Sequence, residues 1–329
     1  MIRIGVDLGG TNLRAARVGA DHAIVAAHRE LVGEPRDVDS IVARVALAIE
    51  QLADVPEAHA PIFDDDPGEV VAVGVGIAAM LRGDDGTVAN SPHLRWRDQP
   101  FGARLAARLG PRFRVGVYND ANAVVWGEVV AGAARGCRDV LGVYVGTGIG
   151  AGVVCNGRLV AGASHTAGEL GHAKVRWDDD AEPCRCGSRG CVEAYLGGSY
   201  LDRAVRRDLA ARPKQLARVV ALAGGAELVT LAHVDAAAGE GDAYALELWE
   251  QRAPLLAVAL GNALAVLNSE RLVLGGGVLS RCPVLLDHVV TTLHVAAPAA
   301  CVEKLSIVAA ALGDDAGLVG AADLATMQP

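Results

Sequence analysis

Three cysteines and a glutamate lie close together in the segment CRCGSRGCVE, as Cys184, Cys186, Cys191 and Glu193. Structural zinc usually has four cysteine or histidine ligands, and His172, twelve residues before Cys184, would complete such a set. The alternatives are a redox pair or buried free thiols. C-x-C is a poorer redox motif than C-x-x-C, and the two glycines between the last two cysteines are typical of tight turns around a metal. The pattern therefore favours a structural zinc ion.

An amide and a carboxylate adjoin in the segment YNDANAVVWGE, where a strand over 113–120 is expected to end before a helix that begins around Ala121. Phosphoryl transfer to a hydroxyl needs one positioned base that orients the hydroxyl and accepts its proton, and Asp120 is the candidate. The alternative is that Asp120 caps the following helix, because Asp and Asn are favoured at that position.

The segment GELGH places Glu169 and His172 three residues apart, on one side of a helical turn. A polyol pocket needs acceptors and donors of this kind, each matched to a hydroxyl. Taken alone, either residue is also consistent with a surface or core position.

Three glycine-rich turns are candidate phosphate or nucleotide sites. DLGGTN contains Asp7, Gly9, Gly10, Thr11 and Asn12; VGTGIGAG contains Gly146, Thr147, Gly148 and Gly150; LGGGV contains Gly275, Gly276 and Gly277. Backbone amides can approach an anion where no Cβ intervenes, and Asp7 can organise Mg²⁺ or its waters. Each turn alone is also consistent with an ordinary hairpin or, for LGGGV, with a strand-to-helix turn. VGTGIGAG is not a Rossmann motif, because a strand follows it.

The elements that must position these residues form a repeated pattern. Apolar runs and helical periodicity predict strands over 2–7, 13–18, 23–30, 70–77 and 113–120, helices over 38–53 and 99–110, and an acidic loop over 64–69. The strand, glycine turn, strand pattern restarts over 139–160, at an offset of roughly 140 residues. A long helix over 242–268, a strand that ends in LGGG and a terminal helix follow.

The repeat predicts an α/β fold with two similar lobes that face a cleft. We expect a small lobe from residues 1–119 plus a C-terminal helix at about 312–329, and a large lobe from 120–311 that carries the zinc loop.

The composition excludes some classes of protein. A net charge of −9 and a pI of about 5.5 argue against nucleic acid or a membrane surface as a partner, since such binders normally show a basic face. Seven cysteines, three clustered and four scattered, do not resemble a secreted disulfide framework. The chain enters a strand pattern at once, with no signal-peptide pattern, so we expect a cytoplasmic protein.

The motifs DLGGTN, NDANA, VGTGIGAG, GELGH, CRCGSRGCVE and LGGGV occur in the order seen in the ROK family of sugar kinases, and the chain resembles that family over essentially its whole length. The resemblance implies two ribonuclease H-like, actin-like ATPase lobes with a central cleft. It also implies ATP with Mg²⁺, a sugar substrate, a structural Zn²⁺ and a homodimer.

The resemblance gives the candidate residues specific roles. It implies that Asp120 is the catalytic base and that Asn119, Glu169, His172 and Glu193 bind sugar hydroxyls. His172 would bind both the sugar and the zinc. The first two glycine turns would bind phosphates, and LGGGV would lie near adenosine.

Two segments depart from the family pattern. Ala78 and Ala79 stand where the family commonly has Pro-Gly, and His93 stands where Asn is common. Ala79 and His93 would lie near the sugar, so the departures affect substrate identity and leave the phosphotransfer residues intact. Glucose is the first expectation; another hexose, an N-acetylhexosamine, fructose or a sugar-like cyclitol are the alternatives. A sugar-sensing repressor of the same family would carry a helix-turn-helix before DLGGT, where only six residues precede Asp7.

Overall fold

A computed structural model describes residues 1–55 and 69–327. The acidic loop expected over 64–69 lies, apart from Glu69, outside these described residues. Within the described part of the chain, every helix is too short or too polar to cross a lipid bilayer.

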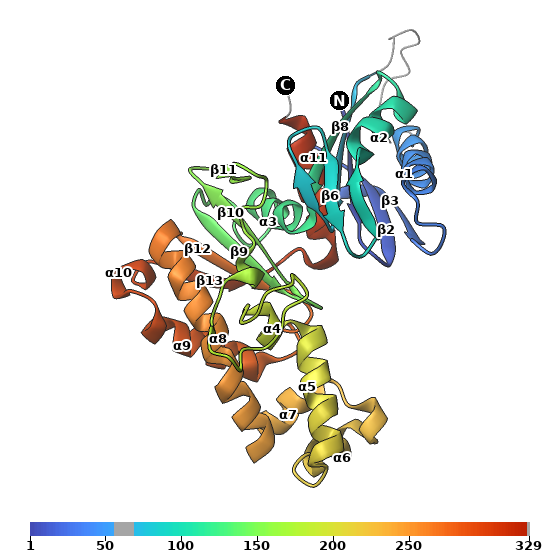
Figure 1. Cartoon of the computed structure of the whole chain (residues 1–329). Coiled ribbons are helices and arrows are strands. Elements are labelled where there is room, and N and C mark those ends of the chain that lie inside the picture. Colours follow the sequence, from blue (N-terminus) through green and yellow to red (C-terminus); the bar gives the residue numbers. More distant parts are fainter. Residues whose placement is uncertain (56–68, 328–329) are drawn as a thin grey trace.

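The first lobe is a five-stranded mixed sheet in the order β3-β2-β1-β4-β8. Its strands are β1 (Ile2–Leu8), β2 (Asn12–Val18), β3 (Ile24–Leu31), β4 (Val71–Ile77) and β8 (Phe113–Asn119). The first three strands form an antiparallel meander, and β4 and β8 are parallel to β1. Helices α1 (Val38–Ala53) and α2 (Phe101–Leu109) pack on one face, as Figure 1 shows.

The second lobe repeats this topology. Its sheet runs β11-β10-β9-β12-β13, formed by β9 (Val140–Val145), β10 (Ile149–Cys155), β11 (Arg158–Leu159), β12 (Arg271–Gly275) and β13 (Ser306–Ala309). Strands β9 to β11 are antiparallel neighbours, while β12 and β13 run parallel to β9. The internal repeat expected from the sequence is therefore confirmed at the level of strand order.

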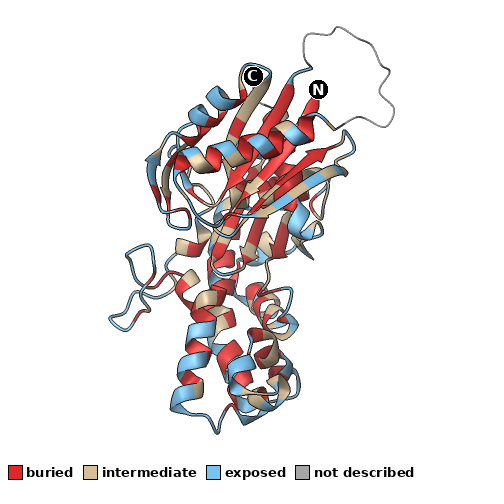
Figure 2. Cartoon of the chain, turned by 90° about the vertical axis from the view of Figure 1, so that its right-hand side faces the viewer, coloured by how far each residue is buried: buried red, intermediate tan, exposed pale blue. Residues whose placement is uncertain are grey.

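Helices extend the second lobe away from its sheet (Figure 1). They are α4 (Glu193–Leu196), α5 (Gly198–Ala211), α6 (Ala217–Ala223), α7 (Leu231–Gly239), α8 (Ala243–Leu267), α9 (Pro283–Ala296) and α10 (Ala299–Val302). Trp249 on α8 is fully buried in the apolar cluster that joins these helices to the sheet. Figure 2 shows the buried residues continuing from the sheets into the spaces between the helices.

Two helices join the lobes. Helix α3 (Asp120–Val130) follows β8 of the first sheet, and α11 (Ala316–Thr326) follows β13 of the second sheet and packs back onto the first. The contact of α11 with that sheet is backbone to backbone, because a Cβ at Gly5 of β1 would lie 1.8 Å from the carbonyl oxygen of Leu318. The chain passes between the lobes twice, once through α3 and once between β13 and α11. Both passages therefore lie at the packed pair of α3 and α11. The domain boundaries at 119/120 and 311/312 stay a prediction.

A small sheet of β5 (Met80–Arg82), β6 (Thr87–Ser91) and β7 (Trp96–Gln99) was not expected from the sequence. The two departures from the family pattern adjoin its strands, because Ala79 directly precedes β5 and His93 lies between β6 and β7. Trp96 anchors it: the indole is 5% exposed, its Nε1 donates to the carbonyl oxygen of Arg36 at 2.6 Å, and its ring packs on Phe101.

Candidate active site and metal centre

The candidate base lies at the junction of β8 and α3. Asp120 is the first residue of α3, one residue earlier than the expected helix start. Asn119 is the N-cap: its Oδ1 accepts from the Asn122 amide at 3.2 Å, while its Nδ2 donates to the carbonyl oxygen of Ala79 at 3.2 Å. The alternative that Asp120 caps this helix is therefore wrong. Capping is done by its neighbour, and the Asp120 Oδ1 accepts only a local bond from the Ala121 amide, at 2.9 Å.

The environment of Asp120 makes its carboxylate basic. Burial is the main cause, and the negative charges of Asp7 and Glu169 add to it, so that the pKa of Asp120 rises from its ordinary 3.8 to about 6. With a pKa of about 6, the Asp120 carboxylate is ionised at neutral pH and can still accept a proton readily. This is the electrostatic state that a general base requires.

Asp7, one residue before the end of β1, lies beside an arginine that the sequence analysis did not identify. Arg14 on the paired strand β2 donates from Nε to Asp7 Oδ2 at 3.0 Å and forms an ion pair with the same oxygen through its terminal nitrogen. Arg14 also lies 3.5 Å from Asp314 Oδ2. These bonds use Oδ2, so Oδ1 is the oxygen that Asp7 can offer to a hydrated Mg²⁺.

Glu169, His172 and Glu193 form a second polar group. His172 Nε2 lies 3.8 Å from Glu169 Oε2, and Glu193 Oε2 accepts from the Ile149 amide of β10 at 2.9 Å. Partial burial raises the pKa of Glu169; His172 opposes the shift and the charge of Glu193 adds to it. His172 ends a short 3₁₀ turn (Leu170–His172), so the expected helical turn in GELGH is confirmed.

The four predicted metal ligands converge. The ligand atoms of His172, Cys184, Cys186 and Cys191 all lie within 4.8 Å of one another. The Sγ atoms of Cys186 and Cys191 are 3.7 Å apart, as are Cys184 Sγ and His172 Nδ1. Tetrahedral zinc with Zn–S bonds of about 2.3 Å separates its ligand atoms by about 3.7 Å. The donor set and its spacing therefore fit a closed, structural Zn²⁺ site.

The metal loop links the zinc ligands to the polar group. A β-bridge pairs Lys174 with Cys191, and the Val192 amide donates to the carbonyl oxygen of Ala173 at 2.9 Å. His172 comes directly before Ala173 and Glu193 directly after Val192, so the antiparallel register places both residues at the same end of this bridge. His172 turns Nδ1 toward the cysteines, which leaves Nε2 facing Glu169. A metal that closes the loop would thus fix both side chains.

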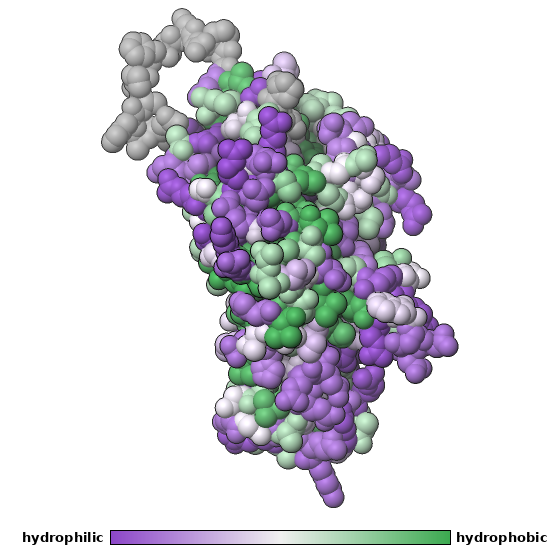
Figure 3. All heavy atoms as spheres, turned by 90° about the vertical axis from the view of Figure 1, so that its left-hand side faces the viewer, coloured by the Kyte–Doolittle hydropathy of each residue, from purple (hydrophilic) through white to green (hydrophobic). Residues whose placement is uncertain are grey.

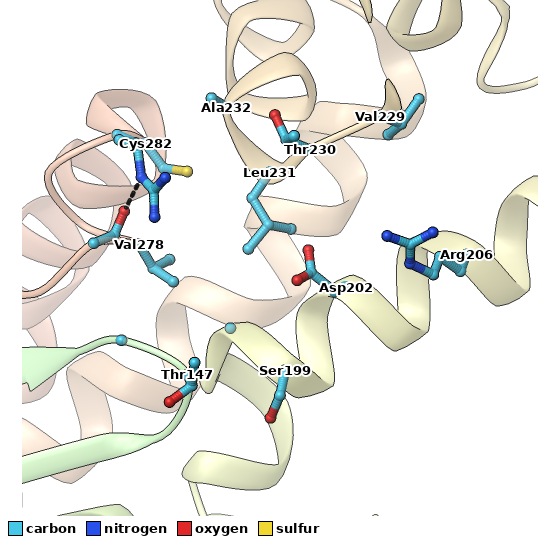
Figure 4. A pocket seen from close by; sticks show the side chains of 14 residues that line it. Thr147, Ser199, Asp202, Arg206, Val229, Thr230, Leu231, Ala232, Val278 and Cys282 are labelled. Atoms are coloured by element: carbon cyan, nitrogen blue, oxygen red, sulfur yellow. Dashed lines mark hydrogen bonds between the residues drawn. The ribbon is translucent and has the colours of Figure 1, made fainter. Parts of the chain in front are cut away.

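A cavity of about 370 Å³ lies where two of the glycine turns meet. Gly146 and Thr147 of the β9–β10 turn line it together with Gly277 after β12. Figure 4 shows Asp202 of α5 pointing into the cavity opposite Leu231, with Thr147 and Ser199 below. Apolar side chains beside a few hydroxyl and charged groups suit a nucleoside, and the bare turn amides suit its phosphates.

Close contacts, one with backbone and one with a side chain, explain two glycines of these turns. Gly276 has φ of +89°, and a Cβ there would lie 2.5 Å from the carbonyl oxygen of Val145. A Cβ at Gly148 would lie 2.5 Å from Glu193 Oε2, so this glycine makes room for the carboxylate.

The remaining predicted nucleotide residues lie outside this cavity lining. Gly150 faces Ala121 of α3, and Gly275 faces the Tyr144 ring. The first glycine turn, with Gly9, Gly10, Thr11 and Asn12, follows Asp7 on the other lobe. Its role with phosphate stays a prediction.

Ala79 and His93, which depart from the family pattern, both contact residues of the candidate site. Ala79 is 8% exposed, and its carbonyl oxygen accepts a hydrogen bond from Asn119 Nδ2. His93 is exposed, and a Cβ at Gly10 would lie 2.7 Å from the His93 Cβ, so the imidazole sits against the first glycine turn. A second cavity, of about 500 Å³, opens between the lobes and is bordered by Asn119 and His165.

Several residues that contact the candidate site residues or line the cavity were not identified from the sequence. They are Arg14 at Asp7, Lys174 at the zinc loop, and Ser199, Asp202 and Thr230 in the nucleoside-sized cavity. Lys174 Nζ lies 3.1 Å from Cys191 Sγ, where its charge offsets the thiolates. The rarity of lysine in this chain was the available signal, since Lys174 is one of only three.

Comparisons with known proteins agree with this geometry. The ROK family model matches residues 3–328. A glucokinase of Streptomyces coelicolor is 32% identical over 326 residues, covering 98% of this chain and 97% of its own. An N-acetyl-D-glucosamine kinase of Erwinia tasmaniensis is 31% identical and covers 86% of both chains. The crystal structure of a ROK family glucokinase from Streptomyces griseus with glucose and AMPPNP is 30% identical, covers both chains fully and superposes with a TM-score of 0.78. The paired α/β lobes and the full-length matches together establish that this chain is a member of the ROK family, with the actin-like fold of its glucokinases.

Proposed function

We propose that this protein is an ATP-dependent hexose kinase that phosphorylates the primary (6-) hydroxyl of its substrate, with glucose as the first candidate. The observation that carries the proposal is Asp120, held at a strand-to-helix junction with its pKa raised to about 6. Relatives named as glucokinases and an N-acetyl-D-glucosamine kinase support the substrate class. Another hexose, an N-acetylhexosamine, fructose or a sugar-like cyclitol remain the alternatives.

In the proposed reaction Asp120 orients the sugar hydroxyl and accepts its proton while the oxygen attacks the γ-phosphate in line. The new bond joins the sugar oxygen to phosphorus, the bond to the β-phosphate oxygen breaks, and ADP leaves. Asn119, Glu169, His172 and Glu193 accept and donate hydrogen bonds to the other hydroxyls. The Thr147 amide would donate to a phosphate oxygen, since Thr147 lines the cavity while the Gly146 amide donates to the carbonyl oxygen of Gly148 at 2.9 Å.

The proposed enzyme would bind two metal ions. Asp7 would hold Mg²⁺ through its free carboxylate oxygen, and the ion would neutralise phosphate charge. Zn²⁺ on His172, Cys184, Cys186 and Cys191 would be structural, because all four positions of a tetrahedral ion are filled by protein.

We also propose a cytoplasmic homodimer. Figure 3 shows apolar residues gathered in the middle of one face, between more hydrophilic ends. Val266 on α8 and Val295 on α9 are 84% and 86% exposed, and apolar side chains so open to water favour a protein contact.

The test is a sugar panel. Purified protein with Mg-ATP and glucose, N-acetylglucosamine, N-acetylmannosamine, mannose, fructose or inositol should release ADP with at least one of them, and ³¹P NMR of the product should show a phosphate on the primary hydroxyl for a hexose. Absence of turnover with every compound would refute the kinase assignment.

A further inference from the structure

Glu128 is a buried carboxylate that the proposed reaction does not use. It lies on α3, two turns after Asp120, and is 0% exposed. Its Oε2 accepts from the Ala133 amide at 2.7 Å, and its Oε1 accepts from the amides of Ala311 and Leu312, both at 2.9 Å. A carboxylate buried at this depth is costly unless such bonds satisfy it. Here three backbone donors do so.

Two of the donors to the Glu128 carboxylate lie in a segment that connects the two lobes. Residues 311 and 312 belong to the crossing from β13 of the second sheet to α11 on the first. The other crossing runs directly from β8 into α3, at Asp120. One side chain therefore fastens the second crossing to the helix that begins with the candidate base.

Small residues reinforce this attachment. A Cβ at Gly127 would lie 2.1 Å from the carbonyl oxygen of Ala316, and one at Gly320 would lie 1.8 Å from that of Ala123. Helices α3 and α11 are thus in backbone contact along their lengths, and neither can shift without the other. Movement of the lobes must be absorbed around this rigid pair.

We propose that Glu128 is a positioning residue that fixes the second interlobe crossing to α3 and thereby holds Asp120 in place as the lobes close on substrate. The inference rests on the proposed kinase function. Glu128 touches no substrate; it acts through the helix that carries Asp120. The role requires both carboxylate oxygens, because a glutamine would turn an amide donor toward backbone donors and lose an acceptor.

The kinetic test compares Glu128→Gln with wild type, using glucose and Mg-ATP or the panel sugar that supports turnover. Misplacement of a reacting group by about 1 Å costs about a hundredfold in rate, so kcat should fall ten- to a hundredfold. Sugar affinity, followed by tryptophan fluorescence, should change less than threefold. The acidic limb of kcat/KM should move to lower pH, since burial is the main cause of the raised pKa of Asp120 and a displaced Asp120 would be less buried.

Asp208→Asn is the matched control. Asp208 on α5 is also a buried carboxylate, 9% exposed, which accepts from Tyr244 Oη and Arg212 at 3.1 Å, far from the crossings. It should lose stability and keep kcat and the pH profile. If Glu128→Gln keeps wild-type kcat, or if both variants lose kcat alike, the positioning role is refuted. A wild-type protein with no turnover would instead refute the kinase proposal.

Hydrogen exchange on the wild-type protein tests the attachment even if Glu128→Gln fails to fold. Ala311 is exposed as a residue, yet its amide and that of Leu312 should be strongly protected, with and without sugar and Mg-AMPPNP. Exchange at the rate of an open linker in either state would overturn the proposal.

Discussion

Replacement of Asp120 by Asn should raise the stability of the protein while it abolishes most turnover. Asn keeps the shape and the Oδ1 that accepts from the Ala121 amide, but it removes a charge that the folded state disfavours. A tenfold change in proton affinity corresponds to about 1.4 kcal/mol, so raising the pKa from 3.8 to about 6 costs the ionised folded state about 3 kcal/mol. Water at the partly exposed side chain screens part of this, which leaves an expected gain of about 1 to 3 kcal/mol.

The pH dependence has a definite sign. Because the folded pKa lies above the unfolded one, the folded protein holds a proton between pH 3.8 and about 6 that the unfolded chain has lost. The wild-type free energy of unfolding therefore decreases, relative to Asp120→Asn, as pH rises through this window. The variant should be more stable at pH 8 and equal to wild type near pH 4.

Urea unfolding at pH 8, 6 and 4.5 measures this difference, with Asp287→Asn as the control, since Asp287 is exposed on α9.

In parallel, Asp120→Asn should bind sugar with near wild-type affinity and lose about 10²- to 10⁴-fold in kcat. A variant that is no more stable at pH 8, or whose advantage does not change with pH, would refute the buried-base reasoning. Near-normal activity would reject Asp120 as the base.

Three further predictions follow from the same geometry. Cys186→Ser should lose the single zinc per chain expected by metal analysis and also lose stability and sugar affinity, because His172 and Glu193 are no longer fixed; metal-free protein with unchanged unfolding and activity would contradict this. Gly148→Ala should raise the KM for sugar about tenfold with little effect on the KM for ATP, since its Cβ displaces the Glu193 carboxylate; equal changes in both constants would count against a sugar-side role. Arg14→Gln should lower the Mg²⁺ concentration for half-maximal activity about tenfold, because Asp7 loses a cationic partner; an unchanged Mg²⁺ requirement would place the ion elsewhere.

Local pattern was enough to predict most of the fold. Helix α1 occupies the predicted 38–53, and β4 and β8 match 70–77 and 113–120 to within one residue. These segments are long, strongly periodic or continuously apolar, and they end in clear cap or acidic signals. The zinc ligands were also predictable, because four donors of the right type at short spacing have few other uses.

Pairings between distant residues were not predictable. The partner of Glu128 is a backbone segment more than 180 residues away, and the pairing of Asp7 with Arg14 depends on strand register. Sequence could not show whether Asn119 or Asp120 caps α3, since both residue types are good caps and only the backbone angles decide. The small β5–β7 sheet was missed because its strands are three to five residues long and mostly polar.

The most direct test of the central claim is the pH dependence of kcat/KM for the wild-type enzyme, measured with the best sugar of the panel at saturating Mg-ATP. If the ionised Asp120 accepts the hydroxyl proton, the rate should fall tenfold per pH unit on the acidic side, with a midpoint near pH 6. A profile that stays flat down to pH 4.5 would contradict the account.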